Sequence, residues 1–250
     1  MNTIFETGHS KNAANFEDLI SVCTGYGAAY NPSKASIKIA AMTTLLTTAR
    51  NALQSVKSAK TNFDNATNAR ELAFLPLKKL CTKIINSLEA TDATQQLIDD
   101  AITVNHKIHG VRAKKLDVEP LEDNTTEVTT TTQHKNISVS QQSYDSLIDH
   151  FTKLIQVVSS EPLYVPNELD LKVTNLNTQL ASLKTSNTAV INAHTTYSNA
   201  ILTRNLIMYQ HLSGLVDTAL EAKKYIKSVF GASSPQHKQI SKIKFRKYDL

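Results

Sequence analysis

The chain has 250 residues, of which 41% are hydrophobic, and this is enough for one large domain or two modest ones with a buried core. Six Gly, six Pro and no Trp are low counts for a turn-rich sheet protein, so the composition favours an all-α fold. Two cysteines are too few for a disulfide framework or a structural zinc site, and we expect a reduced, cytoplasmic setting. The net charge is +5, with the basic residues unevenly placed.

The sequence shows no sign of a secretory signal or a membrane-spanning helix. Residues 1–16 lack a basic segment followed by an apolar run. The chain also lacks any run of about 18 apolar residues, so we expect no transmembrane segment.

The first predicted helix begins near Ala13. It follows a polar stretch, residues 1–12, that we expect to be a flexible N-terminus. Phe16 and Leu19 fall on one helical face, and Gly25 is expected to end the helix.

A long helix is predicted next, because neither Gly nor Pro occurs between Pro32 and Pro76. Asn31 followed by Pro32 is a typical helix start. Apolar residues then step by three and four, as in the seam of a coiled coil. At about 1.5 Å per residue, 40 residues extend about 60 Å, so we expect an elongated bundle. A hairpin at 63–67 is the alternative to a continuous helix, and Pro76 should kink or restart it.

This long stretch occurs twice. Residues 30–72 align without a gap on residues 164–206, and 12 of the 43 aligned pairs are identical, which predicts an internal duplication. We expect two tandem repeats, 13–115 and 144–250, related by a pseudo-twofold axis. The two coiled-coil-like helices, starting at Pro32 and at Pro166, should then pack their seams into one shared core.

The remaining elements of the first repeat are a helix and a linker. Thr91 or Asp92 can start a helix that reaches His109, with Gly110 as its stop. Residues 116–143 are rich in Thr and have no helical period, so we expect a mobile linker.

In the second repeat, Gly231 is expected to end a helix. Ser234 followed by Pro235 can begin a short terminal one. After a small change of register, the alignment of the two copies resumes with Leu88 paired to Leu220.

Polar residues interrupt the predicted seam. Lys60 and His194 are equivalent, and Asn187 stands where the first copy has Leu53. Such residues usually set register or partner choice. We prefer this interpretation to a catalytic or ligand role for His194, which would need a constellation of further groups.

Arg70 and Arg204 recur at equivalent seam-like positions. A half-buried arginine needs a carboxylate or carbonyl partner, so we expect a structural pair across the pseudo-twofold axis. A shared anion site is the alternative.

His106 and His109, one helical turn apart near Asp99 and Asp100, are the nearest approach to a metal site. A metal needs further converging ligands, so we favour a role in balancing the helix dipole.

Each repeat ends in a basic segment, residues 107–115 in the first and 238–247 in the second. The candidate anion or nucleic-acid contacts are Lys107, Arg112, Lys114, Lys115, Lys238, Lys242, Lys244, Arg246 and Lys247. Ile240, Ile243 and Phe245 alternate with basic residues in the second segment. We favour docking of these apolar residues on the bundle, with the lysines left in water, and keep phosphate binding with base stacking as the alternative.

The sequence contains no Gly-rich phosphate loop, nucleophile elbow, paired CxxC or HExxH motif. We therefore expect neither an enzyme nor a catalytic, cofactor or metal site. The preferred hypothesis is a non-enzymatic helical interaction or scaffold protein that binds a protein, either itself as an oligomer or another chain. Nucleic-acid binding through the basic segments is the alternative. A third hypothesis is a helical pore-forming protein whose amphipathic helices refold into membranes.

Overall fold

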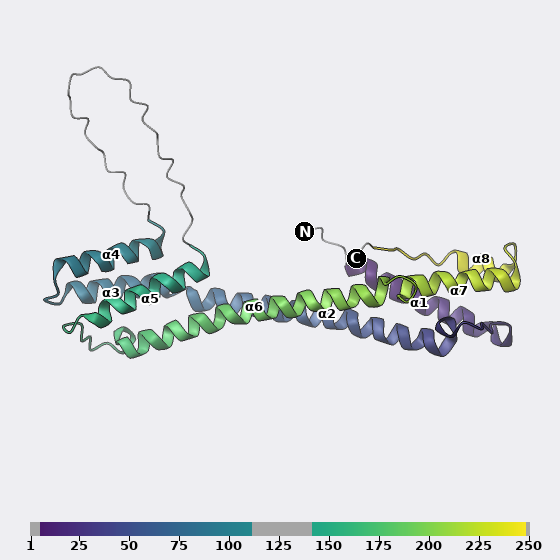
Figure 1. The fold of residues 1–250 in the computed structure, drawn as a ribbon, viewed down its shortest axis with the longest axis horizontal. Coiled ribbons are helices and arrows are strands. Elements are labelled where there is room, and N and C mark those ends of the chain that lie inside the picture. The colour runs from purple at the N-terminus through teal and green to yellow at the C-terminus, as the bar shows by residue number, and fades with distance from the viewer. Residues whose placement is uncertain (1–5, 112–141, 249–250) are drawn as a thin grey trace, which may run out of the picture. The chain divides into compact units, whose positions relative to one another are not determined.

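The computed structural model describes residues 6–111 and 142–248, which form helices and connecting turns and contain no strand (Figure 1). This confirms the all-α prediction. The α-helices are α1 (Glu6–Gly25), α2 (Ile39–Phe74), α3 (Leu77–Glu89), α4 (Gln95–His109), α5 (Tyr144–Ser160), α6 (Val173–Tyr209), α7 (Leu215–Phe230) and α8 (Pro235–Ser241). Short 3-10 helices are η1 (Gly27–Ala29), η2 (Ala35–Ile37) and η3 (Leu169–Leu171). The linker predicted at 116–143 falls almost wholly outside the described residues, as do Arg112, Lys114 and Lys115.

The first helix begins earlier than the sequence suggested. Helix α1 starts at Glu6 and not near Ala13, so part of the stretch expected to be flexible is helical. His9 and Asn12 are buried there, although both are polar. Contacts between these two side chains and residues far away in the sequence stabilise this part of the helix. Local sequence patterns cannot predict such contacts.

The two long helices run without a break. Helix α2 continues through residues 63–67, which excludes the hairpin alternative, and ends at Phe74 just before Pro76. Helix α6 contains 37 residues and is also continuous. The absence of Gly and Pro therefore predicted helix continuity correctly.

Both long helices start about two turns later than predicted, at Ile39 and Val173 instead of Pro32 and Pro166. The Tyr30 hydroxyl donates a hydrogen bond to the Ile37 carbonyl at 2.7 Å. Tyr164 does the same to Leu171 at 3.1 Å. A carbonyl bonded in this way is not paired within a helix, so each segment forms a 3-10 turn first and becomes α-helical only afterwards.

The chain divides into two compact units. Unit 1 consists of Met1–Ala66 and Ile191–Leu250, and unit 2 of Thr67–Val190. The units do not coincide with the predicted repeats, 13–115 and 144–250, because each unit combines the start of one repeat with the end of the other.

Unit 1 has its own apolar core, in which Phe16 and Leu19 of α1 pack with Met42 and Leu46 of α2 and with Ala219 of α7. All five side chains are almost completely inaccessible to water. Such burial is the main source of stability for a helical unit.

Unit 2 has a separate core, in which Phe151 and Leu154 of α5 pack with Ile84 of α3, Ile108 of α4 and Leu180 of α6. Leu46 and Leu180 are both buried, but in different cores. The structure thus corrects the expectation that the two seams share one core.

The register proposed for the later part of the repeats is also corrected. Leu88 is fully buried, whereas Leu220 is 42% exposed, so the two are not equivalent. The buried residues of α3 instead match those of α7 when Leu77 is paired with Leu215 and Leu88 with Ile226.

Helix α4 begins at Gln95, after Thr94, and not at Thr91 or Asp92 as predicted. Three other predicted helix ends agree with the sequence signals. Gly110, with φ of 75°, caps α4 in the left-handed conformation. Gly231 ends α7, and the Ser234 side chain accepts a hydrogen bond from His237 N at the start of α8. None of the described helices is long and apolar enough to cross a membrane.

Candidate binding surfaces

The predicted arginine pair is placed in two different environments. Arg70 lies in unit 2, where its Nη1 donates to Asn187 Oδ1 at 3.0 Å and its guanidinium lies 4.0 Å from the Tyr144 ring centroid. Asn187 Nδ2 in turn donates to Asp145 Oδ1 at 2.7 Å. The polar seam residue Asn187 therefore links the arginine to a carboxylate, which is the kind of partner a half-buried arginine requires.

Arg204 lies in unit 1 and is only 3% exposed. Its Nε and Nη2 both donate to Asn205 Oδ1, at 3.1 and 2.7 Å. Arg70 and Arg204 thus have protein partners of their own, and these contacts fit a structural role for each arginine better than an anion site.

His106 and His109 lie in different surroundings. His109 turns back on its own helix, with Nδ1 3.0 Å from the Asn105 carbonyl, while Nε2 lies 3.4 Å from Thr82 Oγ1 on α3. His106 is exposed. Within residues 6–111 and 142–248, no three His, Cys, Asp or Glu side chains are grouped so that they could hold a metal ion.

His194 is exposed and makes one aromatic contact, whereas the two cysteines are buried. His194 packs edge-on against Phe63, with ring centroids 5.3 Å apart. Burial raises the pKa of the Cys23 thiol to about 11 and that of Cys81 to about 12. Burial therefore disfavours the thiolate form of both cysteines.

Helix α8 and the segment after it dock on unit 1, as favoured from their apolar residues. Ile240 is fully buried, and Ile243 and Phe245 pack against the core of unit 1. Asn12 forms two hydrogen bonds with the Arg246 backbone: its Nδ2 donates to the carbonyl at 2.7 Å and its Oδ1 accepts from the amide at 3.0 Å. Asn15 Nδ2 donates to the Lys244 carbonyl. These bonds fix the backbone of the segment against α1.

An aromatic cluster holds the end of this segment. Tyr248 packs on His9 and on Tyr209, with ring centroids 5.0 and 5.4 Å apart. A hydrogen bond of 2.5 Å joins His9 Nδ1 to the Tyr209 hydroxyl. The Tyr248 hydroxyl approaches Gly8 so closely that a Cβ there would lie 2.0 Å away. Phe245 and Tyr248 are thus engaged with the core, so base stacking by these aromatic rings is not supported.

Docking leaves the basic side chains on the surface. Lys242, Lys244 and Arg246 are exposed, whereas Ile243 and Phe245 between them are partly buried. Alternate residues of an extended segment point to opposite sides, which explains how the same segment both packs and presents charge. Docking and anion binding are therefore compatible interpretations of this segment.

Helix α7 adds further positive charge beside the segment. Lys223 Nζ donates to the Ile243 carbonyl at 2.8 Å. Burial lowers the pKa of Lys223, and the nearby charge of Lys244 lowers it further. Lys227 lies one helical turn after Lys223 and is exposed. We use the name basic face of unit 1 for six basic side chains of α7, α8 and the segment that follows. They are Lys223, Lys227, Lys238, Lys242, Lys244 and Arg246.

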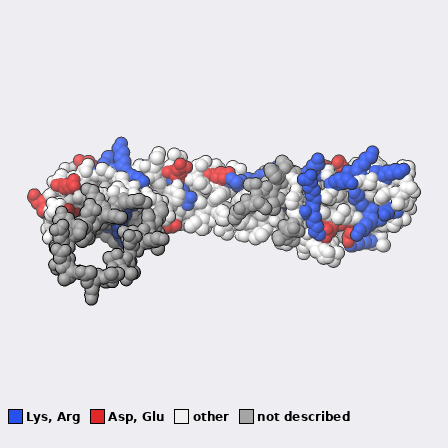
Figure 2. Space-filling view, turned by 90° about the horizontal axis from the view of Figure 1, so that it is seen from above, with Lys and Arg blue, Asp and Glu red and all other residues white. Residues whose placement is uncertain are grey.

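The acidic side chains of this region are already paired. Asp217 forms an ion pair with Lys247 at 3.0 Å, and Glu221 pairs with Lys34 at 2.6 Å. Residues 215–248 contain eight basic and two acidic side chains, a net charge of +6. Figure 2 shows Lys and Arg gathered over α7, α8 and the segment that follows.

The corresponding region of unit 2 is balanced. Residues 77–111, which hold α3 and α4, contain four basic and four acidic side chains. Of the lysines and arginine predicted as contacts in the first basic segment, the structure describes Lys107, which is exposed. The excess of positive charge in residues 215–248 therefore has no counterpart in residues 77–111.

Sequence reasoning missed Lys223 and Lys227 as members of the basic face. Their spacing of one helical turn, in a stretch with no acid after Glu221, was a readable signal. Their closeness to Lys244, however, depends on how the last segment folds back across α7.

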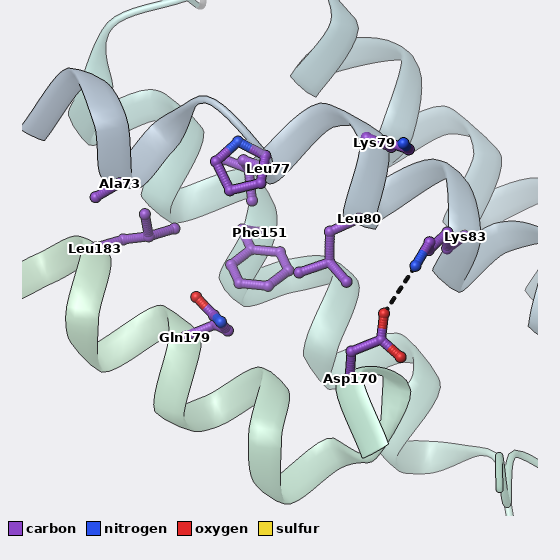
Figure 3. Close-up of a pocket in the computed structure, with 10 residues that line it drawn as sticks. Ala73, Leu77, Lys79, Leu80, Lys83, Phe151, Asp170, Gln179 and Leu183 are labelled. Carbon is purple, nitrogen blue, oxygen red and sulfur yellow. Dashed lines mark hydrogen bonds and ion pairs between the residues drawn. The ribbon is translucent and has the colours of Figure 1, made fainter. Parts of the chain in front are cut away.

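Unit 2 contains a cavity of about 280 Å³ that the sequence did not suggest (Figure 3). Its lining residues come from the end of α2, the loop to α3, and α3, α5, η3 and α6. They are Ala73, Pro76, Leu77, Lys79, Leu80, Lys83, Phe151, Asp170, Gln179 and Leu183.

Comparisons with known proteins give no match: no protein-family model, no curated protein and no solved structure is similar to the chain. The function must therefore be argued from the surfaces described above.

Proposed function

We propose that the protein is a non-enzymatic helical interaction protein and that the basic face of unit 1 is its binding surface. The observation that carries this proposal is the charge of residues 215–248, where eight basic side chains face two acids that are both already paired. A cationic surface of this kind attracts anionic partners over several ångströms and raises their association rate.

Nucleic acid is the class of partner that this surface fits best. Lys244 and Arg246 are exposed at alternate positions of the docked segment, whose backbone is held by hydrogen bonds from Asn12 and Asn15. Lys242, also exposed, lies just before them at the end of α8. Lys223 and Lys244 repel each other, and a phosphate placed beside them would relieve this repulsion. Because the nearby aromatic rings are packed inward, binding should be driven by phosphates and independent of base sequence.

The proposal is tested by fluorescence anisotropy with a labelled single-stranded oligonucleotide of mixed sequence and with its duplex, over a range of salt concentrations. We expect binding at low salt that weakens steeply as salt rises, since each neutralised phosphate releases counterions. Replacing Lys242, Lys244 and Arg246 by Gln should reduce the slope of log K against log salt by about 2 for single strands.

A matched control removes the same charge from unit 2. The triple substitution of Lys78, Lys79 and Lys107 by Gln should leave both affinity and slope nearly unchanged. If neither oligonucleotide binds at low salt, or if both triple variants weaken binding equally, the nucleic-acid proposal is rejected. Binding to anionic lipid vesicles alone would assign the surface to a different partner.

A protein partner, or self-association into a scaffold, is the second candidate. Leu202 and Leu206 lie one turn apart on α6 and are 61% and 51% exposed, so this helix offers apolar surface to another chain. Light scattering after size exclusion would show a concentration-dependent mass if copies associate through this surface. Leu202→Glu should then abolish the association.

We also propose that the chain arose by tandem duplication, with coiled-coil-like α2 and α6 as equivalent elements related by a pseudo-twofold axis. The gapless alignment of the two copies pairs Tyr30 with Tyr164. It also pairs Ile37 with Leu171, whose carbonyls accept the hydrogen bonds of these two tyrosines. The 3-10 turns and the helix starts recur in the same register, which supports this proposal.

A further inference from the structure

The cavity of unit 2 has an apolar floor. Leu77, Phe151 and Leu183 are buried and close its base, and Leu80 forms part of a wall. In Figure 3 the Phe151 ring lies in the middle of these side chains. A volume of about 280 Å³ is near the lower limit of about 300 Å³ for small-molecule sites. The cavity therefore suits a small ligand with a hydrocarbon body.

The rim of the cavity is polar and carries more positive than negative charge. Lys79, Lys83, Asp170 and Gln179 lie there and are all exposed. Lys83 Nζ and Asp170 Oδ2 form an ion pair at 2.9 Å, drawn as a dashed line in Figure 3. Lys79 is thus the cation of the rim that Asp170 does not neutralise, and an anionic group placed at the rim would find a favourable potential.

The positive rim is not a consequence of the plan common to both units. The burial pattern that pairs Leu77 with Leu215 also pairs Lys79 with Asp217 and Lys83 with Glu221. In unit 1, these two acids form ion pairs with Lys247 and Lys34. The corresponding positions are therefore acidic in one unit and basic in the other.

Two residues of α6 that line the cavity also differ from the residues of α2 with which they are aligned. The alignment of the two copies pairs Gln179 and Leu183 of α6 with Leu45 and Ala49 of α2. An amide at the rim and a large apolar residue at the floor are therefore features of the unit 2 site. Their combination with the two lysines gives the site one apolar end and one polar end.

We propose that this cavity binds a molecule with a short hydrocarbon chain and a single carboxylate, of the kind represented by a medium-chain fatty acid. The chain occupies the space over Phe151, Leu77 and Leu183. The carboxylate lies at the rim, where Lys79 and Lys83 attract it. This site is independent of the basic face of unit 1, so either proposal can fail without the other.

The first experiment is a calorimetric titration of the full chain with hexanoate and octanoate, with octylammonium and 1-octanol as comparison ligands. Octanoate should bind more tightly than hexanoate by about fourfold for each added CH₂, up to the capacity of the cavity. Octylammonium should bind at least about tenfold more weakly than octanoate, because like charges meet at the rim. Equal binding of octylammonium or 1-octanol, or no heat at millimolar octanoate, would overturn the proposal.

Two surface variants locate the carboxylate. Lys79→Glu should weaken octanoate binding by about tenfold or more, because it reverses the charge of the rim. Asp170→Asn should strengthen binding by releasing Lys83 from its ion pair. Lys11→Glu, the same charge change at an exposed position of α1 in unit 1, should have no effect. If Lys79→Glu and Lys11→Glu weaken binding equally, the ligand responds to overall charge and the site is wrong.

A third variant locates the hydrocarbon chain. Ala73→Leu adds volume at a half-buried position of the lining and should abolish binding while leaving the helical circular dichroism signal intact. Gln179→Leu, an exposed rim position, provides a second readout if Ala73→Leu fails to fold: it removes the amide and should weaken octanoate without affecting 1-octanol. Undiminished octanoate binding in Ala73→Leu would contradict the proposed position of the chain, and undiminished binding in Gln179→Leu would contradict the proposed position of the carboxylate.

Discussion

Units 1 and 2 share several structural features but differ in charge. In each unit a tyrosine hydroxyl bonds the carbonyl at the end of a 3-10 turn, and a long helix begins just after that turn. In each unit an ion pair also joins the region of that turn to the short helix after the other long helix. In unit 1 the turn region contributes the base, Lys34, and in unit 2 it contributes the acid, Asp170.

The reversed polarity of the two ion pairs matches the helix that packs against the turn region in each unit. Lys34 pairs with Glu221 of α7, and Asp170 pairs with Lys83 of α3. If each half had packed on itself, Lys34 would face Lys83, and Asp170 would face Glu221. Like charges would then meet at both places, so the charges of the two pairs fit the packing of α7 in unit 1 and of α3 in unit 2.

The strongest way to test the separateness of the two units is to open a hole in each core. Phe16 of unit 1 and Phe151 of unit 2 are both fully buried. Phe16→Ala and Phe151→Ala should each cost about 3–5 kcal/mol of unfolding free energy. Hydrogen exchange should rise in α1 and α7 for the first variant and in α3, α4 and α5 for the second.

Leu206→Ala serves as the control for these core variants, because Leu206 is about half exposed and its truncation should change little. Equal acceleration of exchange in both units by either core variant would show that they unfold as one, contrary to their division into separate cores.

The next largest effect concerns the shared tyrosine bond. Burial raises the pKa of Tyr30, and it raises the pKa of Tyr164 to about 12. Tyr30→Phe and Tyr164→Phe each leave a carbonyl without its partner and should cost about 1–2 kcal/mol, measured by urea denaturation. Tyr197→Phe, at a half-buried position of α6 where the ring stacks on Phe63, should have a much smaller effect. A large cost in only one of the first two variants would break the equivalence of the units.

The stability of the two units should depend differently on pH. His150 is 6% exposed, and its ring makes no hydrogen bond within the described part of the chain. Burial lowers its pKa below 6.5; Asp149 opposes this shift, and Lys107 and Lys153 add to it. The folded state therefore favours neutral His150, so unit 2 keeps its full stability above pH 6.5 and loses it as the pH falls through the lowered pKa.

His150→Leu should remove this loss and raise stability at neutral pH by about 1 kcal/mol, because no buried ring nitrogen is left without a partner. Thermal unfolding between about pH 5 and pH 7.5 provides the measurement. An unchanged pH dependence in His150→Leu would show that other groups control the stability of unit 2 in this range.

The smallest expected effect tests the reversed ion pairs. Both pairs are at the surface, so each is worth about 0.2–1 kcal/mol. Glu221→Lys should destabilise unit 1 by facing Lys34 with a like charge, and adding Lys34→Glu should restore it. A double-mutant cycle with no coupling energy would mean that the pairs have no part in assigning halves to units.

Much of the helical structure could be predicted from the sequence, because the signals were local. The stretch free of Gly and Pro predicted the continuity of α2, and Gly110, Gly231 and Ser234 marked helix ends correctly. The helix starts at Pro32 and Pro166 were wrong because the Tyr30 and Tyr164 hydroxyls compete for the carbonyls that a helix would use.

The composition of the units could not be read from local patterns. The apolar spacing of α2 and α6 shows that each helix has a buried face, but not which segment covers it. The same limit applies to the basic face and the cavity. Lys223 meets Lys244, and Lys79 and Phe151 line one cavity, only through tertiary packing.

The central proposal is that the two units share several structural features and that the surface which binds nucleic acid lies on unit 1. Hydrogen–deuterium exchange of the full chain, with and without a mixed-sequence single-stranded oligonucleotide at low salt, tests it most directly. Peptides covering residues 223–247 should gain protection, and peptides covering residues 78–109 should not. Equal protection of both regions, or protection confined to unit 2, would contradict the account.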